Sequence, residues 1–226
     1  MKIKLLFLLI ILVLPPTTEG KEPTRVACIG NSITYGYGLK NRSEECYPAV
    51  LGIMLGENYT VENFGISART LLNKGDHPYM QEKLFTEARA FHPDIVIIKL
   101  GTNDTKPHNW KYGKEFRKDL SALIDSFRCE GNPRIYLCYP ATVYGTKWGI
   151  NDSTIVHGVI PAIKKTARRK KVKIIDRVIC SGRHCFQNNL ISSFFSFFKV
   201  PFFSKNFTEN FPSVLNTLTS FYILIV

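Results

Sequence analysis

Three residue types that serve acyl-transfer chemistry follow three predicted strands, in the order Ser32, Gly65 and Asn103. A serine placed between a strand and a helix can lift its Oγ above the edge of a sheet, close to the amides of the turn. The N–H of a glycine and the side-chain amide of an asparagine are suitable donors to the oxyanion that develops during acyl transfer. Alone, Ser32 would be explained as a helix cap, because Ser is common there. Together the three loops indicate a nucleophile with an oxyanion hole.

The segments that would position these residues alternate between strand-like and helix-like patterns. Apolar runs predict strands at Arg25–Ile29, Tyr59–Phe64, Asp94–Leu100, Arg134–Tyr139 and Val172–Ile175. Apolar residues at helical spacing predict helices at Tyr47–Leu55, Tyr79–Phe91, Glu115–Phe127 and Ser153–Lys170, the last with Asp152 or Ser153 as its cap. This alternation predicts an α/β fold with βαβ units and a five-stranded parallel sheet. Ligands bind at the carboxyl ends of such strands, where the three loops begin.

Three segments at these strand ends carry a family resemblance: IGNSITYGYG, ENFGISARTLL and IKLGTNDTKP. In this order they resemble the first three sequence blocks of the SGNH hydrolase superfamily, also called GDSL esterases/lipases. The resemblance runs from about Arg25 to Asp176 and is greatest to an exported bacterial branch whose members are often esterases acting on acylated carbohydrates. It implies a flavodoxin-like three-layer sandwich, a reaction without metal or organic cofactor, and a small-molecule or carbohydrate ester as substrate.

The resemblance also assigns roles to individual residues. Ser32 is expected to be the nucleophile, and the Ser32 N–H, the Gly65 N–H and the Asn103 side chain are expected to form the oxyanion hole. Asn31 stands where the family's Gly-Asp-Ser triplet has Asp, a variation known within the superfamily.

The catalytic base is the part of the pattern that departs from the family. Members supply it as Asp-x-x-His after the fifth strand, and a serine hydroxyl is a weak nucleophile unless a base takes its proton. No histidine of the chain has a carboxylate three residues earlier: His77, His92, His108, His157 and His184. His184 is the histidine that follows the fifth predicted strand, but the neighbouring Arg183 would disfavour its protonation. The triad is therefore predicted to be incomplete, with His184 as the weaker alternative.

Three functions remain open at this point. The first is an exported serine esterase that removes acyl groups, in particular acetyl, from carbohydrates through an acyl-enzyme. The second is a catalytically impaired or inactive truncated homologue that at most binds acylated glycans. The third assigns the function to the Phe-rich C-terminal segment, which would associate with a partner or, less favoured, with a membrane, since exposed apolar surface is otherwise a liability.

The chain divides into three parts by composition. Residues 1–20 combine a basic start, the apolar run Leu5–Leu14 and a polar exit, a pattern that predicts a secretory signal peptide and export. Residues 21–179 are expected to form the esterase domain, C-terminally incomplete. Residues 180–226 hold ten of the 16 Phe residues and form an irregular hydrophobic tail, for which truncation or a frameshift is the favoured explanation.

The net charge of +12 does not indicate a nucleic-acid partner. Seven of the basic residues lie within one short stretch that ends a predicted helix: Lys164, Lys165, Arg168, Arg169, Lys170, Lys171 and Lys173. Cations are favourable at a helix C-terminus, and no aromatic residues alternate with these to stack on bases.

Six cysteines show neither a C-x-x-C pair nor zinc-finger spacing, so that neither a metal site nor a specific disulfide is predicted.

Overall fold

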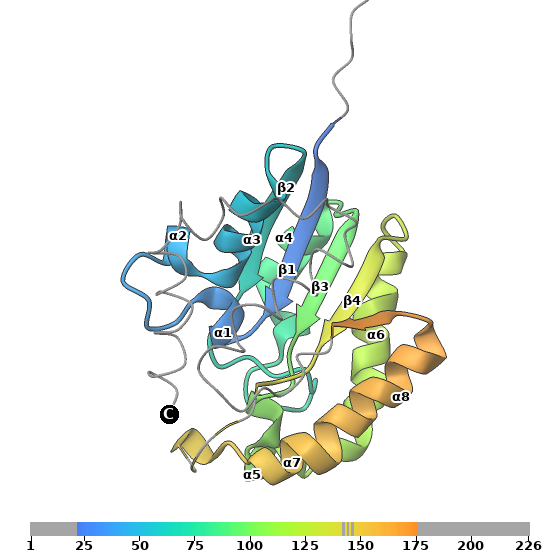
Figure 1. Ribbon diagram of the computed structural model, residues 1–226. Helices are drawn as coiled ribbons and strands as arrows, with labels where there is room; N and C mark the ends of the chain where they lie inside the picture. The colour runs from blue at the N-terminus through green and yellow to red at the C-terminus, as the bar shows by residue number, and fades with distance from the viewer. Residues whose placement is uncertain (1–21, 142, 144, 146, 176–226) are drawn as a thin grey trace, which may run out of the picture.

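The computed structural model describes residues 22–141, 143, 145 and 147–175, which form an α/β domain (Figure 1). Its five strands are β1 (Thr24–Gly30), β2 (Tyr59–Gly65), β3 (Ile95–Lys99), β4 (Arg134–Cys138) and β5 (Lys173–Ile175). All pair in parallel, in the order β2-β1-β3-β4-β5. The predicted five-stranded parallel sheet is therefore confirmed. The predictions for residues 1–20 and 180–226 lie outside the described residues.

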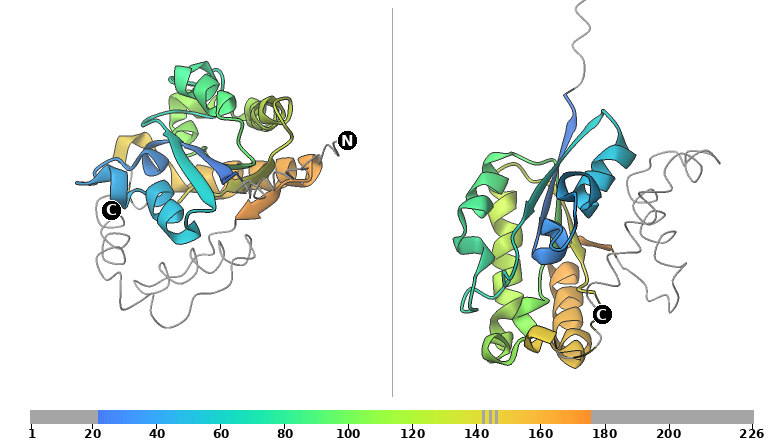
Figure 2. Two further views of the ribbon diagram at one scale, coloured as in Figure 1. Left: turned by 90° about the horizontal axis from the view of Figure 1, so that it is seen from above. Right: turned by 90° about the vertical axis from the view of Figure 1, so that its left-hand side faces the viewer.

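Helices cover both faces of the sheet, giving the predicted three layers (Figure 2). The α-helices are α1 (Ser32–Tyr35), α2 (Arg42–Glu45), α3 (Tyr47–Leu55), α4 (Lys83–Ala90), α5 (Pro107–Trp110), α6 (Phe116–Arg128), α7 (Asp152–Thr154) and α8 (Ile160–Lys170). Short 3₁₀ turns lie at η1 (Tyr79–Gln81), η2 (Asn103–Thr105), η3 (Gly113–Glu115) and η4 (Lys147–Gly149), and a π-helical turn, η5, at Ile155–Val159. No described helix is long and apolar enough to cross a membrane.

The core consists of two buried clusters, one on each face of the sheet, because successive side chains of a strand point to opposite faces of the sheet. One face of β1 and β3 packs against α4, α6 and α8 and includes Ala27, Ile29, Val96 and Ile98. The other face packs against α3 and includes Val26, Cys28, Ile95 and Ile97. All eight side chains are at most 2% exposed. Both faces of these central strands are therefore buried, as their almost continuous apolar sequences require.

Two of the predicted helices are interrupted. The predicted helix Tyr79–Phe91 is a 3₁₀ turn followed by α4, because Glu82 between them is extended (φ −85°, ψ 147°). The predicted helix Ser153–Lys170 contains the π turn η5 directly before Pro161. Proline has no N–H to donate, and a wider turn accommodates the lost hydrogen bond. The helical segment predicted to start at Ser153 is capped by Asn151, not by Asp152 or Ser153. The Asn151 side chain accepts a hydrogen bond from the Thr154 N–H at 2.9 Å.

The basic stretch ends α8, as predicted, and part of it packs against α6. The Lys170 Nζ donates to Asp125 Oδ1 at 2.7 Å, and the Arg169 guanidinium donates to the Ser121 Oγ at 2.7 Å. In return, the Arg128 guanidinium donates to the Lys170 carbonyl at 2.8 Å. These contacts join two neighbouring helices of the same layer, so part of the positive charge has a structural role.

Candidate active site

Because of the register of the sheet, the strands before the three predicted loops end side by side. Gly30, the last residue of β1, pairs with Gly65 at the end of β2 on one side and with Lys99 at the end of β3 on the other. The loops that leave these positions carry Ser32, Ser67–Ala68 and Thr102–Asn103. Because the strands are parallel, all three loops begin at the same edge of the sheet, which is where α/β proteins bind ligands.

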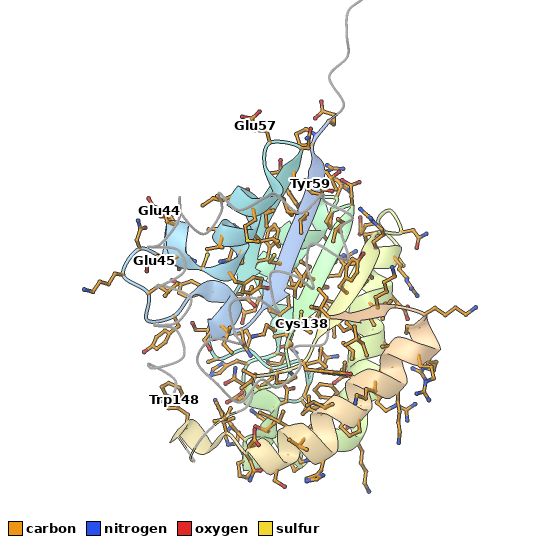
Figure 3. All side chains as sticks on the ribbon, in the orientation of Figure 1. Glu44, Glu45, Glu57, Tyr59, Cys138 and Trp148 are labelled. Carbon is orange, nitrogen blue, oxygen red and sulfur yellow. The ribbon has the colours of Figure 1, made fainter. Side chains whose placement is uncertain are left out.

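A pocket of about 300 Å³ opens at this edge. Its inner wall is formed by small or polar side chains from the three loops: Ser32, Ser67, Ala68, Thr102, Asn103 and Lys106. Larger apolar side chains also line it, namely Tyr37, Leu39, Val143, Trp148 and Ile150; of these, Tyr37 and Trp148 are exposed and mark its mouth. Figure 3 places Trp148 at the carboxyl end of the strands, opposite Glu57 and Tyr59 at the other end of the sheet. The structure thus brings Ser32 and Asn103 together in one pocket.

Ser32 is held at the first position of the short helix α1. Asn31, which is 1% exposed, caps this helix through a hydrogen bond from the Ile33 N–H to its Oδ1 at 3.3 Å. The Ser32 carbonyl accepts hydrogen bonds from the Gly36 and Tyr37 N–H groups, both at 2.9 Å. The Ser32 N–H belongs to the first turn, whose amides have no partner within a helix. It is therefore available to a ligand in the pocket.

Gly65 differs from the prediction. Its N–H donates to the Asn63 Oδ1 at 2.9 Å, and Gly65 does not line the pocket. A Cβ at this position would lie 2.3 Å from the Tyr35 backbone nitrogen, so the glycine is required because α1 passes directly over β2. The Asn63 amide also donates to the Thr34 carbonyl at 2.9 Å. The prediction that Gly65 donates to an oxyanion is wrong in this geometry, because the N–H is already used within the fold.

Ala68 occupies the position that Gly65 was expected to fill. It lines the pocket, its backbone has a positive φ of 67°, and its N–H makes no hydrogen bond to another described residue. The Asn103 Nδ2 donates to the carbonyl of the next residue, Arg69, at 3.1 Å, which holds this turn against Asn103. A side-chain amide has two N–H groups, so one of them stays available for a ligand. No sequence pattern indicated Ala68, because an alanine at positive φ is uncommon.

Asp104 fixes the loop that carries Ala68. This carboxylate is fully buried and accepts hydrogen bonds from the Leu72 N–H at 2.7 Å and the Leu71 N–H at 3.1 Å. Burial raises the pKa of the Asp104 carboxyl to about 6, although the two backbone hydrogen bonds lower it in part. Asp119 of α6 accepts a further bond from the Asn73 N–H at 2.8 Å. Two carboxylates therefore anchor the loop after β2 to the loop after β3 and to α6.

A carboxylate–imidazole pair lies outside the pocket. His108 Nε2 is 3.1 Å from Asp76 Oδ2, and the same carboxyl group accepts a hydrogen bond from the Asn109 amide at 3.0 Å. Burial raises the pKa of Asp76, but the hydrogen bonds from His108 and Asn109 and the charge of Lys106 outweigh this, so the pKa lies below its usual value. The His108 side chain is 58% exposed. The sequence places His77 beside Asp76, and the partner across the loop could not be inferred from it.

Within the described part of the chain, no histidine lines the pocket. Neither His77, His92, His108 nor His157 is placed there, and His184 lies outside the described residues. Three or more potential metal ligands do not gather anywhere among the described residues. The four described cysteines, Cys28, Cys46, Cys129 and Cys138, are free thiols. The described polar side chains that line the pocket thus belong to Ser32, Ser67, Thr102, Asn103, Tyr37 and Lys106, which are hydroxyl-bearing residues, an amide and a lysine.

Comparison with known proteins identifies the family to which this fold and pocket belong. The model of the GDSL-like Lipase/Acylhydrolase family matches residues 28–192, most of the chain. The protein belongs to this family, as the resemblance of its three strand-end segments predicted. The matched region contains Ser32, Ala68 and Asn103.

Individual relatives are esterases by name. An acetylxylan esterase of Xylanibacter ruminicola is 45% identical over 174 residues, which are 69% of this chain and 36% of that protein. The chain thus spans about a third of the length of this relative. Among solved structures, Est24, a carbohydrate acetylesterase from Sinorhizobium meliloti, has a TM-score of 0.55 at 22% identity, and the native aryl esterase of M. smegmatis has 0.55 at 20%. Each of these two matches covers 68% of this chain and 83% of the other. At such identities, they show a common fold.

Proposed function

We propose that this chain is a serine ester hydrolase that removes acetyl groups from carbohydrate through an acyl-enzyme on Ser32. The observation that carries the proposal is that Ser32 shares one pocket with the Asn103 amide and the Ala68 turn. Membership of the GDSL-like Lipase/Acylhydrolase family and the name of the acetylxylan esterase relative support the reaction and the substrate class. The second alternative, an inactive homologue that only binds glycans, has no support from these relatives.

In the proposed acylation step, the Ser32 Oγ attacks the ester carbonyl carbon and a base accepts the hydroxyl proton. The carbonyl oxygen becomes an oxyanion, which the Ser32 N–H, the Ala68 N–H and the free N–H of the Asn103 amide stabilise by hydrogen bonds. Donors fixed in advance stabilise such charge without reorganisation during the reaction. When this intermediate collapses, the bond between the carbonyl carbon and the sugar oxygen breaks, and that oxygen takes the proton from the base and leaves as a hydroxyl group. Water then attacks the acetyl-Ser32 ester by the same steps and releases acetate.

The proton acceptor is proposed to come from outside the described residues, since no described histidine lines the pocket. His184 is the histidine that follows β5 in the sequence. If it is the base, His184→Ala should lower the rate of acetyl-ester hydrolysis about as much as removal of Ser32 does, because members of a catalytic unit have non-additive effects. An unchanged rate in His184→Ala would assign the base to another group.

Hydrolysis of acetylated xylo-oligosaccharide and of 4-nitrophenyl acetate by the full chain tests the proposal. Ser32→Ala should lower kcat by about 10³-fold or more, because hydrolases without their nucleophile keep only the contribution of the oxyanion hole and of binding. Ser43→Ala is the matched control: Ser43 lies on α2, exposed, and its Oγ donates only to Asn41. Equal rates for the wild type and Ser32→Ala would exclude serine catalysis.

The location of the enzyme is also a proposal. The first twenty residues have the pattern of a signal peptide, and a xylan-type substrate would be encountered outside the cell. Expression of the full chain in a Gram-negative host, with fractionation and mass determination of the product, would check this. Recovery of the uncleaved chain in the cytoplasm alone would contradict export.

A further inference from the structure

Two exposed aromatic side chains mark the mouth of the pocket. Among the described residues, four large hydrophobic side chains are exposed: Tyr37 (61%), Ile53 (53%), Trp148 (57%) and Val156 (44%). The two aromatic ones both line the Ser32 pocket, while the two aliphatic ones do not. Soluble proteins keep large exposed apolar groups apart from one another unless they serve in binding. Their gathering at one opening is the feature that the reaction on Ser32 does not itself explain.

Tyr37 is fixed relative to the nucleophile. The Tyr37 N–H donates to the Ser32 carbonyl at 2.9 Å, and Gly36 between α1 and Tyr37 turns the chain with a φ of 90°. A Cβ at Gly36 would lie 2.8 Å from the Cys46 Cβ, so this turn passes close to the N-terminus of α3. Tyr37 is therefore held at a fixed position beyond the nucleophile, and its ring is exposed at the mouth of the pocket.

Trp148 is fixed relative to the opposite wall. Its backbone is left-handed (φ 59°, ψ 16°), a conformation that costs a non-glycine residue energy and that persists where the surrounding structure enforces it. The chain then continues through Ile150, which is buried, to Asn151, whose N–H donates to the Thr105 Oγ1 at 3.1 Å. Thr105 closes the turn that begins with Asn103. The indole is thus tied to the loop that carries the amide donor.

We propose that Tyr37 and Trp148 together form a platform that binds the sugar ring carrying the scissile ester; this inference rests on the proposed function. The C–H face of a pyranose ring is apolar and stacks on an aromatic face, while its hydroxyl groups need polar partners nearby. Ser67, whose Oγ has no hydrogen-bond partner among the described residues, lines the same pocket, and so does Lys106, whose Nζ lies 3.7 Å from Asp76 Oδ2. Wide, exposed rings with polar neighbours fit a sugar better than a long acyl chain, which requires an enclosed apolar channel.

Binding to a catalytically silent chain separates this inference from the reaction. In the Ser32→Ala background, acetylated xylo-oligosaccharide should bind by calorimetry and shift the fluorescence of Trp148. The chain has two tryptophans, and Trp110, which is partly buried against Phe116, does not line the pocket. Trp148→Phe should therefore abolish the shift while leaving binding largely intact. Trp148→Ala and Tyr37→Ala should each weaken binding about tenfold, since an aromatic stacking contact contributes at that level. Ile53→Ala and Val156→Ala are the matched exposed controls and should bind as the parent does.

Kinetics on two substrates give the second readout. In the chain with Ser32 intact, Trp148→Ala should raise KM for acetylated xylo-oligosaccharide about tenfold more than KM for ethyl acetate, which has no ring. No binding to Ser32→Ala, a fluorescence shift that persists in Trp148→Phe, or equal losses on both substrates would overturn the platform. If hydrolysis does not depend on Ser32, the proposed function fails instead, while the binding experiment still decides whether the platform exists.

Discussion

The inner wall and the mouth of the pocket are built on different principles. At the inner wall, Ser32, Ala68 and Asn103 lie on short turns that hydrogen bonds and close backbone contacts hold in one arrangement. At the mouth, Tyr37 and Trp148 expose more than half of their surface. The difference teaches that reactivity here depends on backbone placement and selectivity on exposed side chains. Substitutions at the inner wall should therefore alter both rate and stability, and those at the mouth should alter substrate choice.

After the loss of Ser32 itself, the largest expected effect at the inner wall comes from Asn103→Ala. The substitution removes an amide donor from the proposed oxyanion hole, and loss of one such donor costs about 10²–10³-fold in kcat. It also removes the hydrogen bond to the Arg69 carbonyl, a loss of about 1 kcal/mol in the free energy of unfolding. Steady-state kinetics and denaturant unfolding should show the first effect far exceeding the second. If the rate falls no more than the loss of folded protein accounts for, Asn103 has a purely structural role.

The second effect is a pH dependence of stability that originates in Asp104. Its pKa in the folded state, about 6, lies above the ordinary value of 3.8, so the folded state binds the proton more tightly than the unfolded state does. Stability from this group is complete below pH 3.8 and is lost as the pH rises through about 6, a change of about 3 kcal/mol. Urea unfolding at a series of pH values should show this decline relative to Asp104→Asn, which does not titrate. A parallel pH dependence in both proteins would contradict the assignment.

A third prediction compares two glycines. Gly65→Ala would place a Cβ 2.3 Å from the Tyr35 nitrogen, forcing α1 away from β2, at a cost of about 1–3 kcal/mol together with a loss of hydrolysis. Gly52 lies inside α3, where an added Cβ would meet Val61 at an ordinary 3.6 Å. Gly52→Ala should therefore stabilise the protein by up to about 1 kcal/mol, because alanine favours helix. Thermal melts and the rate of ester hydrolysis would distinguish them; equal effects would show that α1 can move without consequence.

The smallest expected effect is that of Ala68→Gly. Glycine adopts positive φ without strain, so the substitution should leave the Ala68 N–H in place, retain activity, and stabilise the protein by at most about 1 kcal/mol. Kinetics and unfolding on the same preparation would measure both quantities. A substantial loss of activity would indicate that the alanine methyl group itself contacts the substrate.

The sequence predicted the strands well because their apolar runs leave few alternatives. All five strands overlap the predicted segments, and the register of the parallel sheet then brought Ser32 and Asn103 together as expected. Prediction from the sequence failed where local backbone geometry or a hydrogen-bond partner far along the chain determines the structure. Glu82 interrupts a helical apolar pattern, and Gly65 donates inside the fold while Ala68 faces the pocket.

The Asp76–His108 pair illustrates the second kind of failure. It joins residues that are 32 positions apart through a loop without regular periodicity, so no sequence pattern connects them. By contrast, Asp104 lies in the turn η2 after the buried strand β3, so its place at the edge of the sheet that carries Ser32 could be expected. Its partners, the Leu71 and Leu72 amides, could not, because they belong to the loop after another strand.

The position of β1 inside the sheet has a consequence for how the protein would lose activity. Ser32 follows a strand that is paired with β2 along its whole length on one side and with β3 from Val26 to Gly30 on the other. Amides of such interior strands exchange with deuterium only when the whole domain opens, whereas edge strands and termini fray separately. Heat inactivation should therefore coincide with global unfolding. Ser32 should keep its position until the whole domain unfolds.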